Sequence, residues 1–136
     1  MIKPICNDIF FLSKKARKAT INDINVAYDL LDTLKANSYR CVGMAANMIG
    51  EDLAIIVAQV GLKYLVMFNP VIISTKGEYE TMEGCLSHSG ERKCIRHHHI
   101  KVKYEDFNFK SHIEEYEGFT AQIIEHEVDH LKGILI

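Results

Sequence analysis

The sequence predicts an α+β domain in which mainly antiparallel sheets pack around a C-terminal helix with an HExxH motif, with a second, N-terminal helix. Two observations lead to this prediction. Short apolar runs rich in β-branched residues are joined by short connections and outnumber the helical segments. Only two segments place apolar residues at helical spacing, one towards each end of the chain. The 136 residues are expected to form one domain, residues 1–136, without repeats or linkers.

The two helices are the most regular of the expected elements. In residues 22–36 apolar side chains recur at helical spacing, and Thr20 or Asn22 is suited to cap the start. The second helix is expected over about residues 119–132, where Gly133 is a natural C-terminal stop. The other expected elements are a hairpin turn at residues 60–62 and strands at residues 53–60, 63–69, 71–74, 77–82, 99–104 and 109–116.

Composition and charge argue against several classes of protein. Hydrophobic residues make up 48% and charged residues 25%, which is typical of a globular domain. The formal net charge of −2 argues against a protein that binds nucleic acid through phosphate contacts. No apolar run is long enough to cross a membrane, and residues 1–11 lack the pattern of a secretory signal. We therefore expect a cytoplasmic protein that binds neither nucleic acid nor a membrane.

Cysteines and histidines are the remaining compositional features. Without an export signal, and with enough apolar residues for a core, the four cysteines are expected to be free thiols. The tract His97-His98-His99 has the composition of a metal-binding tract, but we interpret it as a solvated strand edge.

The expected C-terminal helix contains His126-Glu127-Val128-Asp129-His130, an HExxH motif. Residues four apart lie on one helix face with Cβ atoms about 5–6 Å apart, so both imidazoles can bind one ion. Glu127 projects at a neighbouring angle, from which its carboxylate can reach a water molecule at the ion without binding the ion. For the motif alone, the alternative interpretation is a solvated helix surface.

A catalytic metal site needs a third protein ligand and an open fourth position. The longer pattern HExxHxxGxxH matches as far as Gly133, but Ile136 stands at the position of its third histidine. Only six residues follow His130, which leaves no room for a ligand far downstream. The third ligand is therefore expected upstream of the helix.

Three motifs together resemble the peptide deformylase family. Glu83-Gly84-Cys85-Leu86-Ser87 is a complete EGCLS motif. Residues 125–130 read EHEVDH, which is similar to the QHExDH motif of the family, and residues 41–48 read CVGMAANM, a partial match to a GxGxAAxQ-like stretch. The motifs occur in the family order, and the resemblance covers most of the chain.

The resemblance implies a site and a reaction. Cys85 would be a thiolate ligand beside His126 and His130, with Glu127 as the general base. The backbone N–H of Leu86 would donate to the oxyanion. The implied reaction is hydrolysis of N-formyl-methionyl nascent peptides to formate and a free amino terminus. The implied metal is Fe²⁺ in the cell, with Zn²⁺ or Ni²⁺ in purified protein, and the ribosome is an implied transient contact.

Residues that bind the substrate are implied in the same way. Gly43 would let a peptide approach the backbone and pair with it as an added strand. The other implied contacts are Val42, Arg92 and Ile123 around the methionine side chain, and Met48 beside the reacting carbonyl. Asp129 is expected to be a supporting residue, paired with Arg96.

The sequence departs from the family pattern in three places. Met48 stands where the family has a glutamine that donates to the oxyanion, which predicts reduced turnover. Glu125 replaces the glutamine before the first histidine. The chain ends soon after the helix, so a ribosome contact through a C-terminal tail is not expected. Two alternatives therefore stay open: a non-catalytic or weakly active relative that binds N-terminal peptides, and a hydrolase of another small amide.

Overall fold

A five-stranded sheet is the framework of the fold, which the computed structural model describes for residues 1–136 apart from the side chain of His88. The strands follow the order of the chain and pair antiparallel. They are β1 (Gly43–Ala45), β2 (Ile55–Val60), β3 (Lys63–Cys85), β4 (His88–Glu105) and β5 (Ser111–Glu117). The helices are α1 (Ile9–Leu12), α2 (Ile24–Ala36) and α3 (Gly118–Leu131), with 3₁₀ turns η1 (Ile21–Asp23) and η2 (Ala46–Ile49). The predicted α+β class is confirmed.

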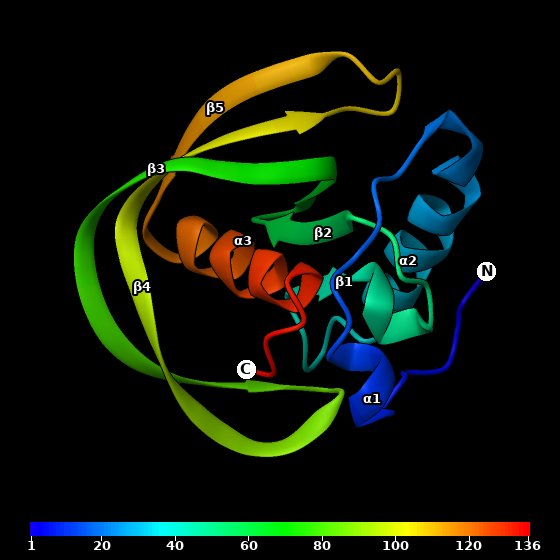
Figure 1. Ribbon diagram of the computed structural model, residues 1–136, viewed down its shortest axis with the longest axis horizontal. Coiled ribbons are helices and arrows are strands. Elements are labelled where there is room, and N and C mark those ends of the chain that lie inside the picture. Colours follow the sequence, from blue (N-terminus) through cyan, green and yellow to red (C-terminus); the bar gives the residue numbers. More distant parts are fainter.

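Strands β3 and β4 form a long hairpin that curves around α3 (Figure 1). The sequence predicted separate strands at 63–69, 71–74 and 77–82, and this was wrong because the chain bends without leaving the sheet. Asn69 has a positive φ of 53°, Pro70 has no N–H, and the pairing with β4 shifts register there. The Asn69 side chain stabilises this bend by hydrogen bonding to both the N–H and the C=O of Ala19, at 2.8 and 2.9 Å.

Strand β2 lies in the middle of the core and is covered on both faces. Ile55 and Val57 belong to the core cluster that contains Leu30 of α2. Ile56 and Ala58 belong to the cluster that contains Ile124 of α3. Successive side chains of a strand point to opposite faces, so a strand between two helices has no polar face. This explains the unbroken apolar run from which the strand was predicted.

The helices agree with the sequence except at their beginnings. α2 begins at Ile24 rather than at residue 22, because η1 precedes it, with Thr20 and Asp23 forming a reciprocal cap. The short helix α1 was not predicted, since four residues cannot display a helical period. Among the described residues, no helix is long and apolar enough to span a membrane.

Residues 88–98 were not predicted as strand but form the first part of β4, which pairs there with β3 alone. The interpretation of the histidine tract as solvated edge is therefore partly confirmed. His98 and His99 are exposed, whereas His97 is half-buried and bonded to the Glu125 carboxylate at 2.7 and 2.8 Å. All four cysteines are free thiols, as predicted.

Candidate metal centre

The two histidines of the HExxH motif point into the core from α3. His126 and His130 lie one helical turn apart, and both are buried. Their Nε2 atoms face each other at 3.1 Å. Two nitrogens bound tetrahedrally to one ion, at about 2.0–2.1 Å each, would lie about 3.3 Å apart. The two imidazoles are therefore already spaced as ligands of a single ion.

The third ligand predicted upstream lies beside this pair. Cys85 ends β3, and its sulfur and the two imidazole nitrogens all lie within 4.8 Å of one another. Within the described part of the chain, no other group of three His, Cys, Asp or Glu side chains has a comparable arrangement. A thiolate and two imidazoles suit zinc, iron, nickel and cobalt, so these side chains fit a divalent metal ion.

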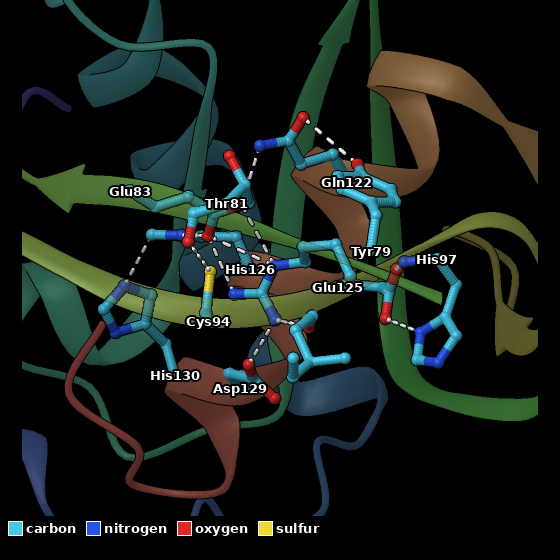
Figure 2. Close-up of polar contacts among 12 residues, drawn as sticks. Tyr79, Thr81, Glu83, Cys94, His97, Gln122, Glu125, His126, Asp129 and His130 are labelled. Carbon is cyan, nitrogen blue, oxygen red and sulfur yellow. Dashed lines mark hydrogen bonds and ion pairs between the residues drawn. The ribbon is translucent and has the colours of Figure 1, made fainter. Parts of the chain in front are cut away.

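A buried carboxylate on β3 fixes the orientation of the first histidine. Glu83 Oε1 lies 2.7 Å from Nδ1 of His126 (Figure 2). The opposite nitrogen, Nε2, is left free to face His130 and Cys85. Burial alone would raise the pKa of Glu83, but hydrogen bonds from His126, Arg96 and Gln122 hold this pKa well below its ordinary range. Glu83 is therefore ionised, and it both orients the imidazole and increases its basicity.

Arg96 connects this carboxylate to the end of the HExxH motif. Its guanidinium binds Glu83 through Nε and Nη2 at 2.8–3.1 Å, and it binds Asp129 through Nη1 at 2.7 Å. The predicted pairing of Asp129 with Arg96 is confirmed. The bond to Glu83 was not foreseen, and it makes Arg96 the link between β3, β4 and α3.

Glu127 has the environment of a general base. It is buried, and its Oε1 atom has no hydrogen-bond partner among the described residues. Burial raises the pKa of Glu127 to about 7, against a partial opposing effect of the positive His126. Burial lowers the pKa of His126, but the negative Glu127 and hydrogen bonds with Cys85 and Glu83 raise it to about 10. A carboxyl group with a pKa near neutrality is suited to accept and return a proton.

A cavity of about 380 Å³ opens onto these side chains. It brings together the three motifs, because Gly43, Cys85 and Glu127 all line it. Most of the predicted substrate residues line it as well, namely Val42, Met48, Leu86 and Ile123. Arg92 does not belong to the described lining and pairs across the sheet with Glu83, so its contact with substrate stays a prediction.

Several lining residues were missed from the sequence. Arg40 and Cys41 lie just before Val42, and Phe119 and Gln122 lie on α3. The signal for the last two was present, since residues 119, 122 and 126 repeat at helical spacing on one face. Arg40 carries no comparable signal, because its place depends on how the chain enters β1.

Strand β1 touches α3 without a side chain between them. A Cβ atom built on Gly43 would lie 2.7 Å from Cγ2 of Ile123 and 2.9 Å from Oε2 of Glu127. Real Cβ atoms essentially never come this close to another heavy atom. The packing of β1 on α3 therefore favours glycine at this position. The family resemblance implied a glycine here for a different reason, namely the close approach of a peptide.

The two residues that depart from the family motifs, Met48 and Glu125, have distinct surroundings. Met48 is 1% exposed, and its Sδ lies 4.0 Å from Sγ of Cys85. The neighbouring Asn47 donates from Nδ2 to the carbonyl of His130 at 2.9 Å, and it does not belong to the described lining of the cavity. The Glu125 carboxylate is hydrogen-bonded to the backbone N–H and to the imidazole of His97 on β4.

The HExxH helix lies beside a cysteine at the end of an antiparallel strand, and a buried carboxylate of the helix lines the same cavity as the cysteine. This arrangement defines a metal-dependent hydrolase. The model of the polypeptide deformylase family matches residues 5–136. The chain therefore belongs to the polypeptide deformylase family, whose members are metal-dependent hydrolases that remove the formyl group from N-formyl-methionyl peptides.

Relatives and solved structures agree with this assignment. The chain is 52% identical to a peptide deformylase of Clostridium beijerinckii over 136 residues, which is 100% of both chains. The structure of the Thermus thermophilus peptide deformylase has a TM-score of 0.87 at 33% identity, covering 99% of this chain and 83% of that one. The Met-Ala-Ser complex of the Acinetobacter baumannii class I type b enzyme has a TM-score of 0.88 at 25% identity, covering 99% and 96%.

Proposed function

We propose that Cys85, His126 and His130 hold one divalent metal ion and that Glu127 is the general base for removal of the formyl group. The observation that carries the proposal is the Glu127 carboxylate, which is buried beside the three ligands and lines the same cavity. A protein that only binds N-terminal peptides has no use for a buried carboxylate with a free oxygen and a raised pKa. Hydrolysis is therefore favoured over binding alone, and the match to the deformylase family favours a formyl peptide over another small amide.

The proposed substrate position is along β1. This strand pairs with β2 on one side only and lies at the end of the sheet. A peptide adding there as a further strand would bring its N-terminus to the cavity, with Val42, Leu86 and Ile123 around the methionine side chain. A bound Met-Ala-Ser in the A. baumannii structure is consistent with a short peptide ligand.

The chemical steps assign a role to each side chain. The metal ion, when bound, polarises the formyl carbonyl and lowers the pKa of water. Glu127 removes a proton from the water as it adds to the formyl carbon, and Leu86 N–H donates to the oxygen that becomes negative. Glu127 then returns the proton to the amine nitrogen as the C–N bond breaks. The products are formate and a peptide with a free amino terminus.

The finer assignments follow the family. The ion is proposed to be Fe²⁺ in the cell, with Zn²⁺ or Ni²⁺ in purified protein. The protein is proposed to work in the cytoplasm on nascent peptides, in transient contact with the ribosome and without direct contact with nucleic acid.

The test is turnover of formyl-Met-Ala-Ser by protein loaded anaerobically with Fe²⁺, or with Ni²⁺. Glu127→Gln should keep its metal and lose about 10²–10⁴ in kcat, the usual contribution of a general base. Glu125→Gln is the matched control, since it neutralises a neighbouring buried carboxylate that does not line the cavity, and it should keep both metal and turnover. Loss of metal from Glu127→Gln would make the residue structural, and full turnover would refute its role as base.

A further inference from the structure

The Met48 thioether lies beside the proposed metal site. None of the roles proposed so far for this site uses the sulfur of Met48. The side chain is 1% exposed and lines the cavity. Its Sδ is 4.0 Å from Sγ of Cys85. Methionine is also a common filler of core gaps, so burial alone does not distinguish a ligand from a packing residue.

The spacing of the two sulfurs is what a shared ion requires. Two sulfurs bound tetrahedrally to one ion, at about 2.3 Å each, would lie about 3.8 Å apart. The 4.0 Å between Met48 and Cys85 is therefore compatible with one ordinary thiolate bond and one longer thioether bond. The two imidazole nitrogens, 3.1 Å apart, satisfy the corresponding condition for two nitrogens bound to one ion.

The backbone holds Met48 in place independently of its side chain. Its carbonyl accepts a hydrogen bond from the N–H of Cys6 at 2.7 Å, and it lies in η2, which Gly50 ends in the left-handed region. The backbone of Met48 is thus positioned before an ion arrives, and burial limits where its thioether can move. A ligand positioned in advance loses little entropy on binding.

The chemistry of the sulfur pair points the same way. The thiol of Cys85 donates weakly to the Met48 thioether. Sites with two histidines, a cysteine and a weak, long axial methionine are known to bind soft transition metals.

We propose that Met48 Sδ is a fourth protein ligand of the metal ion, weaker than Cys85, His126 and His130, and that it shifts metal preference towards softer ions. The proposal rests on the proposed metal site and adds to it a residue that stands where the family has glutamine. A long, weak bond to this sulfur would let the ion become five-coordinate and keep a position for water or substrate. The expected preference is for ions such as Cd²⁺ over Zn²⁺, relative to a site with one sulfur.

The test compares wild-type protein with Met48→Leu, which preserves side-chain volume and removes the sulfur. Met44→Leu is the matched control, because Met44 is equally buried but does not belong to the described lining of the cavity. X-ray absorption at the zinc edge should require two sulfurs in wild type and Met44→Leu, one near 2.3 Å and one longer, but one sulfur in Met48→Leu. The ratio of Cd²⁺ to Zn²⁺ affinity should fall at least several-fold in Met48→Leu alone.

Selenomethionine-labelled protein tests the same contact without any substitution, so it does not depend on the variant folding. At the selenium edge, a metal neighbour should appear when Zn²⁺ is added to the labelled protein. If no metal neighbour appears at the selenium edge, the Met48 proposal is overturned. It is also overturned if the zinc edge shows two nitrogens and only one sulfur in all three proteins. Both results would leave the proposed metal centre intact. A site lacking the Cys85 sulfur or the histidine nitrogens would overturn the proposed metal centre together with the Met48 proposal.

Discussion

Replacing Gly43 by alanine tests the contact on which the position of the general base depends. The added Cβ would lie 2.7 Å from Ile123 and 2.9 Å from Glu127, whereas ordinary van der Waals contact begins at 3.4 Å. The shortfalls are 3.4 − 2.7 = 0.7 Å and 3.4 − 2.9 = 0.5 Å, so both side chains or the helix must move by this much. Both partners lie on α3, which is packed into the core, so they cannot yield without cost.

The magnitude follows from the size of these shortfalls. Overpacking of a core by one methyl group costs about 1–3 kcal/mol. For a domain of this size, about 4 °C of melting temperature corresponds to each kcal/mol, so Tm should fall by about 4–12 °C. A catalytic group displaced by about 1 Å can cost about 10²-fold in rate, and half that displacement of Glu127 should lower kcat about ten-fold or more.

The assays are thermal unfolding, metal content and turnover of formyl-Met-Ala-Ser. Gly84→Ala is the control for stability, because a Cβ there meets backbone only at 3.4 Å, an ordinary contact, and its Tm should stay near wild type. The metal content of Gly43→Ala should not change, since neither contacted side chain is a proposed ligand. If Gly43→Ala has the Tm and kcat of the wild type, the described packing of β1 on α3 is refuted. If the variant loses its metal, the fall in kcat cannot be assigned to a displacement of Glu127.

Further predictions concern protons, the buried ion pair and the oxyanion. His126 has its pKa raised to about 10 before an ion binds and must be neutral to ligate, so Zn²⁺ binding at pH 7 should release its proton and weaken as pH falls. Calorimetry in buffers of different ionisation enthalpy measures this release, and zero release would contradict the described site. Glu83→Gln should destabilise the fold by about 3–5 kcal/mol in urea unfolding and lower metal affinity about 10–100-fold, because it neutralises the more buried of the two carboxylates that pair with the Arg96 guanidinium and the one that orients His126. Glu80→Gln, from an exposed pair, should cost about 0–1 kcal/mol, and an equal cost for both variants would argue against the buried network. Met48→Gln should raise kcat at least several-fold with little change in metal content, because it supplies an amide donor that a thioether lacks; an unchanged kcat would mean that other groups hold the oxyanion.

The sequence was most informative where one residue type has one physical use. The spacing of His126 and His130 on a helix predicted how their rings converge, and the EGCLS motif indicated Cys85 beside them. The apolar run at residues 53–60 correctly indicated a strand, which begins at Ile55. These inferences succeed because the helix and strand periods restrict where side chains can lie.

Strand β4 shows why other parts could not be predicted. Along residues 88–98 its inward positions include Arg96, which is 2% exposed, while Ile95 is 42% exposed. A strand with a buried charge and an exposed apolar residue displays no apolar alternation, so the period that identifies strands is missing. Backbone pairing with β3 and ion pairs such as Lys93 with Glu80 support this segment instead. The Met48 sulfur contact was equally hidden, since no spacing rule relates η2 to the end of β3.

The two motifs that carry the site act as one unit because of their internal spacings. Glu83 and Cys85 are two residues apart on β3, and both contact His126, one at Nδ1 and the other through its sulfur. His126 thus lies between a fixed carboxylate and a thiol, while His130 follows one turn later. A slip of β3 by one residue against α3 would present Gly84 in place of either contact, and it would leave the guanidinium of Arg96 buried without Glu83. The buried ion pair therefore penalises any register in which the ligands fail to meet. The network of Glu83, Arg96 and Asp129 therefore secures the alignment of the metal ligands more than it adds to the stability of the fold.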